Sequence, residues 1–84
     1  MTFALRILRR AERSLAALPS PSYERVRDAI RALGHEARPR GCKKLTARPG
    51  WRIRVGPFRV IYEIDEESQT ITILDIGYRR DVYR

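Results

Sequence analysis

Two runs of alternating residues on either side of Gly56 and Pro57 constrain the fold of this chain more than any other segment. Residues 51–55 (WRIRV) and 58–64 (FRVIYEI) place apolar side chains at every second position, the period of a half-buried strand. Glycine and proline between two such runs are typical of a tight hairpin turn. The sequence therefore predicts an antiparallel β-hairpin with one apolar face.

The flanking segments predict two further strands and a first helix. Residues 3–8 alternate over a short stretch and predict a strand. Residues 9–18 are rich in helix-forming residues and predict a helix that ends before Pro19. Residues 70–77 (TITILDIG) are nearly all apolar, which indicates a strand in the interior of the sheet.

Residues 20–34 predict the most distinct helix of the chain. Its apolar residues recur at spacings of three and four and predict a stripe that packs on the core: Tyr23, Val26, Ile30 and Leu33. Ser20 is the expected N-cap, Pro21 fits the first helical position, and Gly34 fits the C-terminal cap. A basic loop is expected over residues 35–50.

The order β-α-α-β-β-β predicts an α+β fold, in which an antiparallel helix hairpin packs on a small, mainly antiparallel sheet. The 84 residues are expected to form a single domain, 1–84.

The charge is strongly positive and segregated along the chain. The formal net charge is +8, and sixteen of the eighteen cations are arginine, whose planar fork of donors suits phosphate. Residues 37–62 contain no acid but eight cations: Arg38, Arg40, Lys43, Lys44, Arg48, Arg52, Arg54 and Arg59. This pattern favours a nucleic-acid footprint over a basic surface that serves only solubility.

The hairpin concentrates part of this charge. Alternation places Arg52 and Arg54 on one face of the first strand, and a turn with an even number of residues would bring Arg59 to the same face. An odd turn or a bulge would separate them. Together, the three guanidinium groups would form a preformed anion site suited to a phosphodiester; the alternative is that they project into water.

Other chemistry has little support in the sequence. One cysteine, Cys42, cannot form an internal disulfide, and with one histidine, His35, no zinc-ligand spacing is present. We interpret Cys42 as a passive thiol and His35 as a solvated loop residue. The first apolar run (FALRIL) is too short for a signal peptide or a membrane span, so a cytoplasmic protein without membrane association is expected.

Aromatic and basic residues also alternate near the C-terminus, where Tyr78 and Tyr83 lie among Arg79, Arg80 and Arg84. Single-stranded RNA is commonly held by phosphate contacts together with stacking on aromatic or guanidinium planes.

Three segments, RGCKKL (40–45), WRIRVGPFRVIYEID (51–65) and ILDIGYRRDVYR (73–84), resemble the RelE/ParE superfamily of toxins, in particular its RelE branch. The resemblance spans nearly the whole chain. It implies a toxin of a type II toxin–antitoxin system with a cognate antitoxin as partner. RelE-like toxins enter the ribosomal A site and cut mRNA there without a metal or other cofactor, so the ribosome and mRNA are the further expected partners.

The resemblance also implies roles for individual residues. The expected catalytic residues are Arg52, Arg54, Arg59, Arg79 and Tyr83. The expected RNA- or ribosome-binding residues are Arg38, Arg40, Lys43, Lys44, Arg48, Tyr78 and Arg80. Many relatives have histidine where this chain has Tyr78, and arginine is a poor proton acceptor. The general base is therefore left open between Tyr83, Tyr78 and a ribosomal group.

Two other functions are compatible with the same residues. One is a ParE-like toxin that poisons DNA gyrase without nuclease activity, since a fold does not fix a function. The other is a catalytically inactive module that binds RNA or the ribosome.

Overall fold

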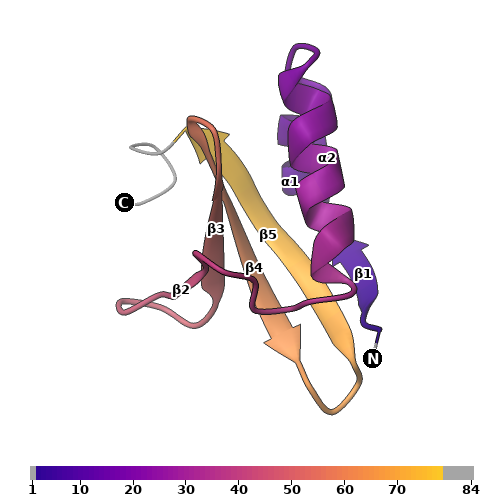
Figure 1. Cartoon of the computed structure of the whole chain (residues 1–84), viewed down its shortest axis with the longest axis vertical. Coiled ribbons are helices and arrows are strands. Elements are labelled where there is room, and N and C mark those ends of the chain that lie inside the picture. The colour runs from indigo at the N-terminus through magenta and orange to yellow at the C-terminus, as the bar shows by residue number, and fades with distance from the viewer. Residues whose placement is uncertain (1, 79–84) are drawn as a thin grey trace.

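The computed structural model describes residues 2–78, which form five strands and two helices (Figure 1). The elements in chain order are β1 (Ala4–Ile7), α1 (Arg9–Ala16), α2 (Ser22–Leu33), β2 (Lys43–Lys44), β3 (Trp51–Val55), β4 (Phe58–Asp65) and β5 (Thr70–Tyr78). The predicted α+β fold is confirmed.

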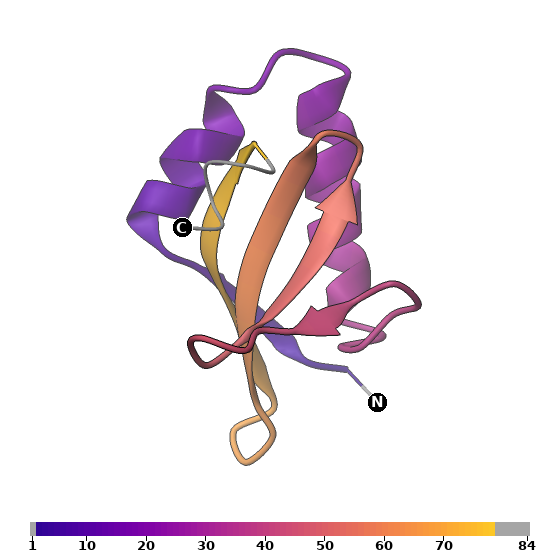
Figure 2. The ribbon, with the colours of Figure 1, turned by 90° about the vertical axis from the view of Figure 1, so that its left-hand side faces the viewer.

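The strands form one mixed sheet in the order β1-β5-β4-β3-β2. Strand β1 pairs in parallel with β5, and the other neighbouring pairs are antiparallel. Strand β5 lies in the interior of the sheet, as its apolar sequence predicted. Both helices cover one face, and Figure 2 shows the opposite face of β3, β4 and β5 toward the viewer.

The turn between β3 and β4 determines which side chains share a face. Gly56 has a φ of +59°, as the first central position of a type II′ turn requires, and Pro57 completes a two-residue turn. The register pairs Val55 with Phe58 and Arg54 with Arg59. The turn is therefore even, and the parity on which the arginine cluster depends is confirmed.

A bulge interrupts the pairing of β4 with β5. Ile61 pairs with Asp75 and Tyr62 pairs with Ile73, so Leu74 has no partner in β4. The extra residue allows Ile73 and Ile76 both to face the core although their sequence positions differ in parity. Regular pairing through this point would have turned Asp75 inward and Ile76 outward.

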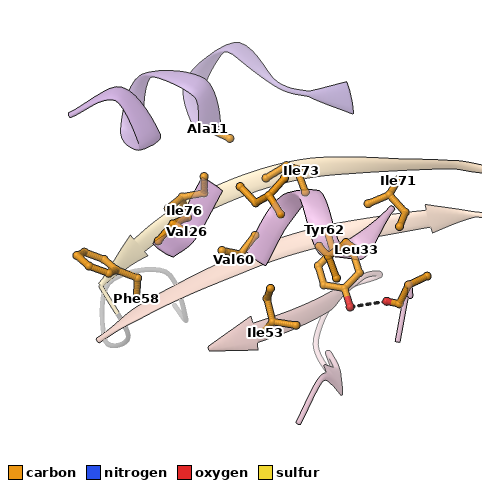
Figure 3. Close-up of a cluster of buried hydrophobic side chains, with 12 residues drawn as sticks. Ala11, Val26, Leu33, Ile53, Phe58, Val60, Tyr62, Ile71, Ile73 and Ile76 are labelled. Atoms are coloured by element: carbon orange, nitrogen blue, oxygen red, sulfur yellow. Dashed lines mark hydrogen bonds between the residues drawn. The ribbon is translucent and has the colours of Figure 1, made fainter. Parts of the chain in front are cut away.

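The core lies between the helices and the sheet (Figure 3). Three of the four predicted stripe residues of α2, Val26, Ile30 and Leu33, are buried in it, and Tyr23 is half-buried. The sheet contributes Ile53, Phe58, Val60, Tyr62, Ile71, Ile73 and Ile76. Neither of the helices among residues 2–78 is long and apolar enough to cross a lipid bilayer.

The predictions for the start of α2 and for the basic loop were wrong in detail. Ser20 is not the N-cap, because the helix begins at Ser22 with Pro21 in the capping position and no capping side chain. The backbone N–H of Tyr23 instead donates to the carbonyl of Pro19, and that of Arg25 donates to the carbonyl of Pro21. Within the loop, residues 43–44 pair with β3 as strand β2.

Candidate nucleic-acid interface

Three arginines lie on the face of the sheet directed away from the helices, here called the arginine face. Arg54 of β3 lies directly opposite Arg59 of β4, and Arg52 lies two residues before Arg54 on the same strand. Arg59 is flanked on its other side by Gly77 of β5, which has no side chain to occupy the neighbouring space. The hairpin thus places three guanidinium groups on one surface, and like charges directly opposite each other reduce the stability of a strand pair.

These arginines differ sharply in exposure. Arg54 is exposed, whereas Arg52 and Arg59 are only 3% and 6% exposed. Buried guanidinium groups are normally engaged by other groups, and both of these are. Arg54 is the most accessible of the three to an incoming phosphate, and all three arginines already have interaction partners. Water and salt screen the charges of buried Arg52 and Arg59 less than they screen an exposed charge. Both residues therefore attract an incoming anion more strongly than surface cations would.

Two cations of the basic loop lie beside this cluster. Lys43 of β2 pairs with Arg52, and Arg40 lies three residues before Lys43. These side chains line a pocket of about 320 Å³ together with Gly41, Ile53 and Arg54. Among the residues that the structure describes, the lining of this pocket includes four cations and no acid.

Two other loop cations lie elsewhere, around the indole of Trp51. The Cζ of Arg38 is 4.9 Å and the Nζ of Lys44 is 5.4 Å from the centroid of the Trp51 ring. Arg38 also forms an ion pair with Glu66 over 2.8 Å. Trp51 lies on the helix-facing side of β3, so the structure divides the loop cations into two sets. Arg48 is exposed in the turn region before β3.

Tyr78 is on the opposite face from the arginines. It pairs with Phe58, whose ring centroid lies 4.9 Å from that of Tyr78, and its side chain is 56% exposed. The side chain of Tyr78 is therefore directed away from the arginine face. The candidate residues Arg79, Arg80 and Tyr83 lie outside the described residues.

The remaining titratable groups provide no second catalytic cluster within the described part of the chain. His35 is exposed just after α2, and Cys42 is partly buried near the hydroxyl of Tyr62. Burial, followed by the neighbouring Cys42, raises the pKa of Tyr62 well above its ordinary value. Among residues 2–78, no three His, Cys, Asp or Glu side chains are placed to hold a metal ion.

Arg40 and Lys43 were expected to act with the other loop cations, and their position beside the hairpin was not predicted from the sequence. The only sequence signal for the division of the loop cations was the pair Lys43 and Lys44. Adjacent residues of an extended segment point to opposite faces, so these two lysines would be separated. Two residues are too few to predict a strand by periodicity.

The chain is similar in structure to several solved toxins and toxin–antitoxin complexes. The chain is similar to one from the archaeal RelE–RelB complex of Pyrococcus horikoshii OT3, with 29% identity, a TM-score of 0.84, and coverage of 96% of this chain and 99% of that one. It is also similar to a chain of the RelBE2 toxin–antitoxin complex of Mycobacterium tuberculosis, with 30% identity, a TM-score of 0.80, and coverage of 94% and 100%. The YoeB/ParE toxin of Agrobacterium tumefaciens shares the fold at 15% identity, with a TM-score of 0.78 and coverage of 92% and 99%. The architecture is therefore that of the RelE-like toxins.

Residues 4–83 match the sequence model of the family described as the ParE toxin of the type II toxin–antitoxin system parDE. No protein of curated function matches the chain in sequence. The chain belongs to the ParE toxin family, within the RelE/ParE superfamily of type II toxins.

Proposed function

We propose that this toxin is a ribosome-dependent mRNA endoribonuclease whose active surface is the arginine face. The observation that carries the proposal is the direct pairing of Arg54 with Arg59, with Arg52 on the same face. A hairpin that only had to fold would gain stability from an uncharged or oppositely charged pair at this position. Retaining the like-charge pair fits a surface that binds a phosphodiester.

The chemistry follows from what guanidinium groups can do. Arg52, Arg54 and Arg59 would orient the scissile phosphate and stabilise the negative charge that develops as the 2′-hydroxyl attacks phosphorus. The bond between phosphorus and the 5′-oxygen breaks, leaving a cyclic phosphate and a 5′-hydroxyl. Arginine stays protonated at neutral pH and cannot take the proton of the 2′-hydroxyl. The proposal therefore leaves both proton transfers, removal of the 2′-hydroxyl proton and protonation of the 5′-oxygen, to Tyr83 or to a ribosomal group. Arg79 would stabilise the transition state or the leaving oxygen.

We also propose a cognate antitoxin and the ribosome as partners in the cytoplasm. The similar chains of the RelE–RelB and RelBE2 structures are from toxin–antitoxin complexes. A net charge of +8 suits both an acidic antitoxin segment and ribosomal RNA.

A second candidate is poisoning of DNA gyrase, which is favoured by the match to the ParE family rather than by the site. In that case, the arginine face would be a binding surface and no phosphodiester would be cut by this chain.

The test compares purified wild type with Arg54→Ala and Arg31→Ala in a translating extract, with primer extension to map mRNA cuts. Arg31 is exposed on α2 and loses the same charge away from the arginine face, which makes it the matched control. We expect cuts at ribosome-occupied codons with wild type and Arg31→Ala, and a loss of about 10²–10³ in rate with Arg54→Ala. Intact mRNA, together with gyrase trapped on cleaved plasmid DNA in a parallel reaction, would establish the second candidate.

A further inference from the structure

We propose that Arg40 and Lys43, together with Arg52, form a second phosphate subsite beside the Arg54–Arg59 pair. The arginine face would then hold two consecutive phosphates of a single-stranded nucleic acid. The inference specifies how the proposed nuclease would bind its substrate. It depends on the proposed function only because it takes single-stranded RNA as the ligand. It narrows the expected role of Arg40 and Lys43 from RNA or ribosome binding to substrate binding, and Arg52 then contacts both phosphates.

The strand register supplies the first observation. Two like-charge pairs cross strand β3: Lys43 pairs with Arg52 on one side of the strand, and Arg59 pairs with Arg54 on the other. Arg52 and Arg54 are two residues apart and share a face, so the centres of the two pairs are separated by about 6.6 Å along β3 and by about 4.8 Å across the strands. This separation is on the scale of the distance between consecutive phosphates in an extended single strand of nucleic acid.

The pocket supplies the second observation. Its volume of about 320 Å³ lies at the lower end of the range of small-ligand sites, which is more than one phosphate group needs. Arg40, Lys43 and Arg54 are exposed, and Arg52 is buried, so the pocket combines accessible cations with a less screened one. At Gly41, whose φ is +91°, an added Cβ would meet no atom of residues 2–78 within 4 Å, so this part of the chain leaves the pocket open at that side.

The contrast between Lys43 and Lys44 supplies the third observation. Lys43 pairs with Arg52, whereas Lys44 pairs with Trp51 and its ammonium lies over the indole ring. Both lysines are exposed and carry the same charge. Long-range electrostatic attraction to RNA would use them equally, but a discrete subsite would use only Lys43. The two positions are therefore a matched pair for an experiment.

The experiment measures binding rather than cleavage, so that its outcome is independent of nuclease activity. The probes are 2′-O-methyl hexanucleotides, which lack the attacking hydroxyl, each with one phosphate replaced by a neutral methylphosphonate. Fluorescence anisotropy with the wild type is expected to show two adjacent positions at which the replacement weakens binding. In the Arg40→Ala/Lys43→Ala variant, we expect sensitivity at one of these positions only.

Salt dependence gives a second readout. For Lys43→Ala, the slope of log K against log [NaCl] should fall in magnitude by about 0.7, the value for one lost phosphate contact on a single strand. Lys44→Ala should reduce the slope less than Lys43→Ala does, because Lys44 lies on the opposite face of β2, and circular dichroism should show both variants folded.

Equal weakening by Lys43→Ala and Lys44→Ala, or a single sensitive phosphate in the wild type, would overturn the subsite even if the protein cuts mRNA. Two sensitive positions with no cleavage in the translating extract would retain the subsite and refute the nuclease.

Discussion

The hydroxyl of Tyr62 donates a hydrogen bond over 2.8 Å to the carbonyl oxygen of Ala37, twenty-five residues earlier in the chain (Figure 3). Both residues are buried, and the bond joins the middle of β4 to the start of the basic loop. The loop that carries Arg40 and Lys43 is therefore attached to the same strand that carries Arg59. The ring of Tyr62 also packs in the hydrophobic core, so the same side chain stabilises the core and holds the start of the basic loop in place.

Tyr62→Phe is expected to lower the free energy of unfolding by about 1–3 kcal/mol, because it leaves the buried carbonyl of Ala37 without its donor. Urea unfolding followed by circular dichroism would measure the change. Tyr23→Phe is the control, since the described part of the chain shows no hydrogen bond from that hydroxyl. Equal effects of the two substitutions would contradict the importance of the bond to Ala37.

The raised pKa of Tyr62 predicts a loss of stability in alkali. Burial favours the neutral phenol in the folded state, so its stabilising contribution is complete below the unfolded pKa of about 10 and is lost as pH rises further. The measurement is the difference in unfolding free energy between wild type and Tyr62→Phe from pH 8 to pH 11. The difference should shrink or reverse above pH 10, and a difference independent of pH would refute the assignment.

Gly56→Ala is expected to destabilise the hairpin by about 1–2 kcal/mol, since an L-residue other than glycine is strained at positive φ. No atom of the described residues lies within 4 Å of the added Cβ, so the expected penalty comes from the backbone. Gly56→Asn should cost less, because asparagine tolerates positive φ better than alanine. Thermal unfolding of the three proteins would show the order Gly, Asn, Ala, and an alanine variant as stable as wild type would exclude this turn geometry.

Asp65 is expected to contribute to stability only while ionised. Backbone N–H groups of Ser68 and Glu67 donate to its carboxylate and lower its pKa. The contribution is therefore present above the unfolded pKa of about 4 and is lost as pH falls through the lower folded value. Asp65→Asn should flatten the dependence of the urea midpoint on pH between pH 5 and pH 2, compared with Asp28→Asn on α2. Identical curves for wild type and Asp65→Asn would contradict the prediction.

The stability of the whole chain should increase with ionic strength. A net charge of +8 and the adjoining cations of the arginine face repel one another, and salt screens this repulsion. The unfolding temperature in NaCl should rise between 50 mM and 500 mM, and it should rise less for Arg54→Gln. Chloride is used because phosphate and sulfate would bind the site. A falling unfolding temperature would indicate that attractive ion pairs dominate instead.

Much of the fold follows from local signals that tertiary contacts did not override. The alternation of β3 and β4, together with the two-residue turn at Gly56 and Pro57, determined both the register and the face shared by Arg52, Arg54 and Arg59. The apolar spacing of α2 placed Val26, Ile30 and Leu33 in the core in the same way.

Features that depend on distant segments could not be predicted. The burial of Arg52 and Arg59 could not be predicted in this way. The alternation of apolar and polar residues predicts the face on which a side chain lies, but not what covers that face. The division of the loop cations depends on two residues of β2 pairing with β3. Tyr78 lies on the other face of the sheet from the arginines because it pairs with Phe58.

The bulge in β5 has a consequence for comparing this chain with its relatives. Leu74 has no partner in β4, and its carbonyl accepts a hydrogen bond from Arg10 of α1 instead. A relative can lack this residue and still keep every cross-strand pair on either side. An alignment without a gap would then displace each position from 75 onward, including those of the tyrosine and arginines near the C-terminus. Roles in that segment are better assigned by counting from the pair formed by Arg59 and Gly77 than from the end of the chain.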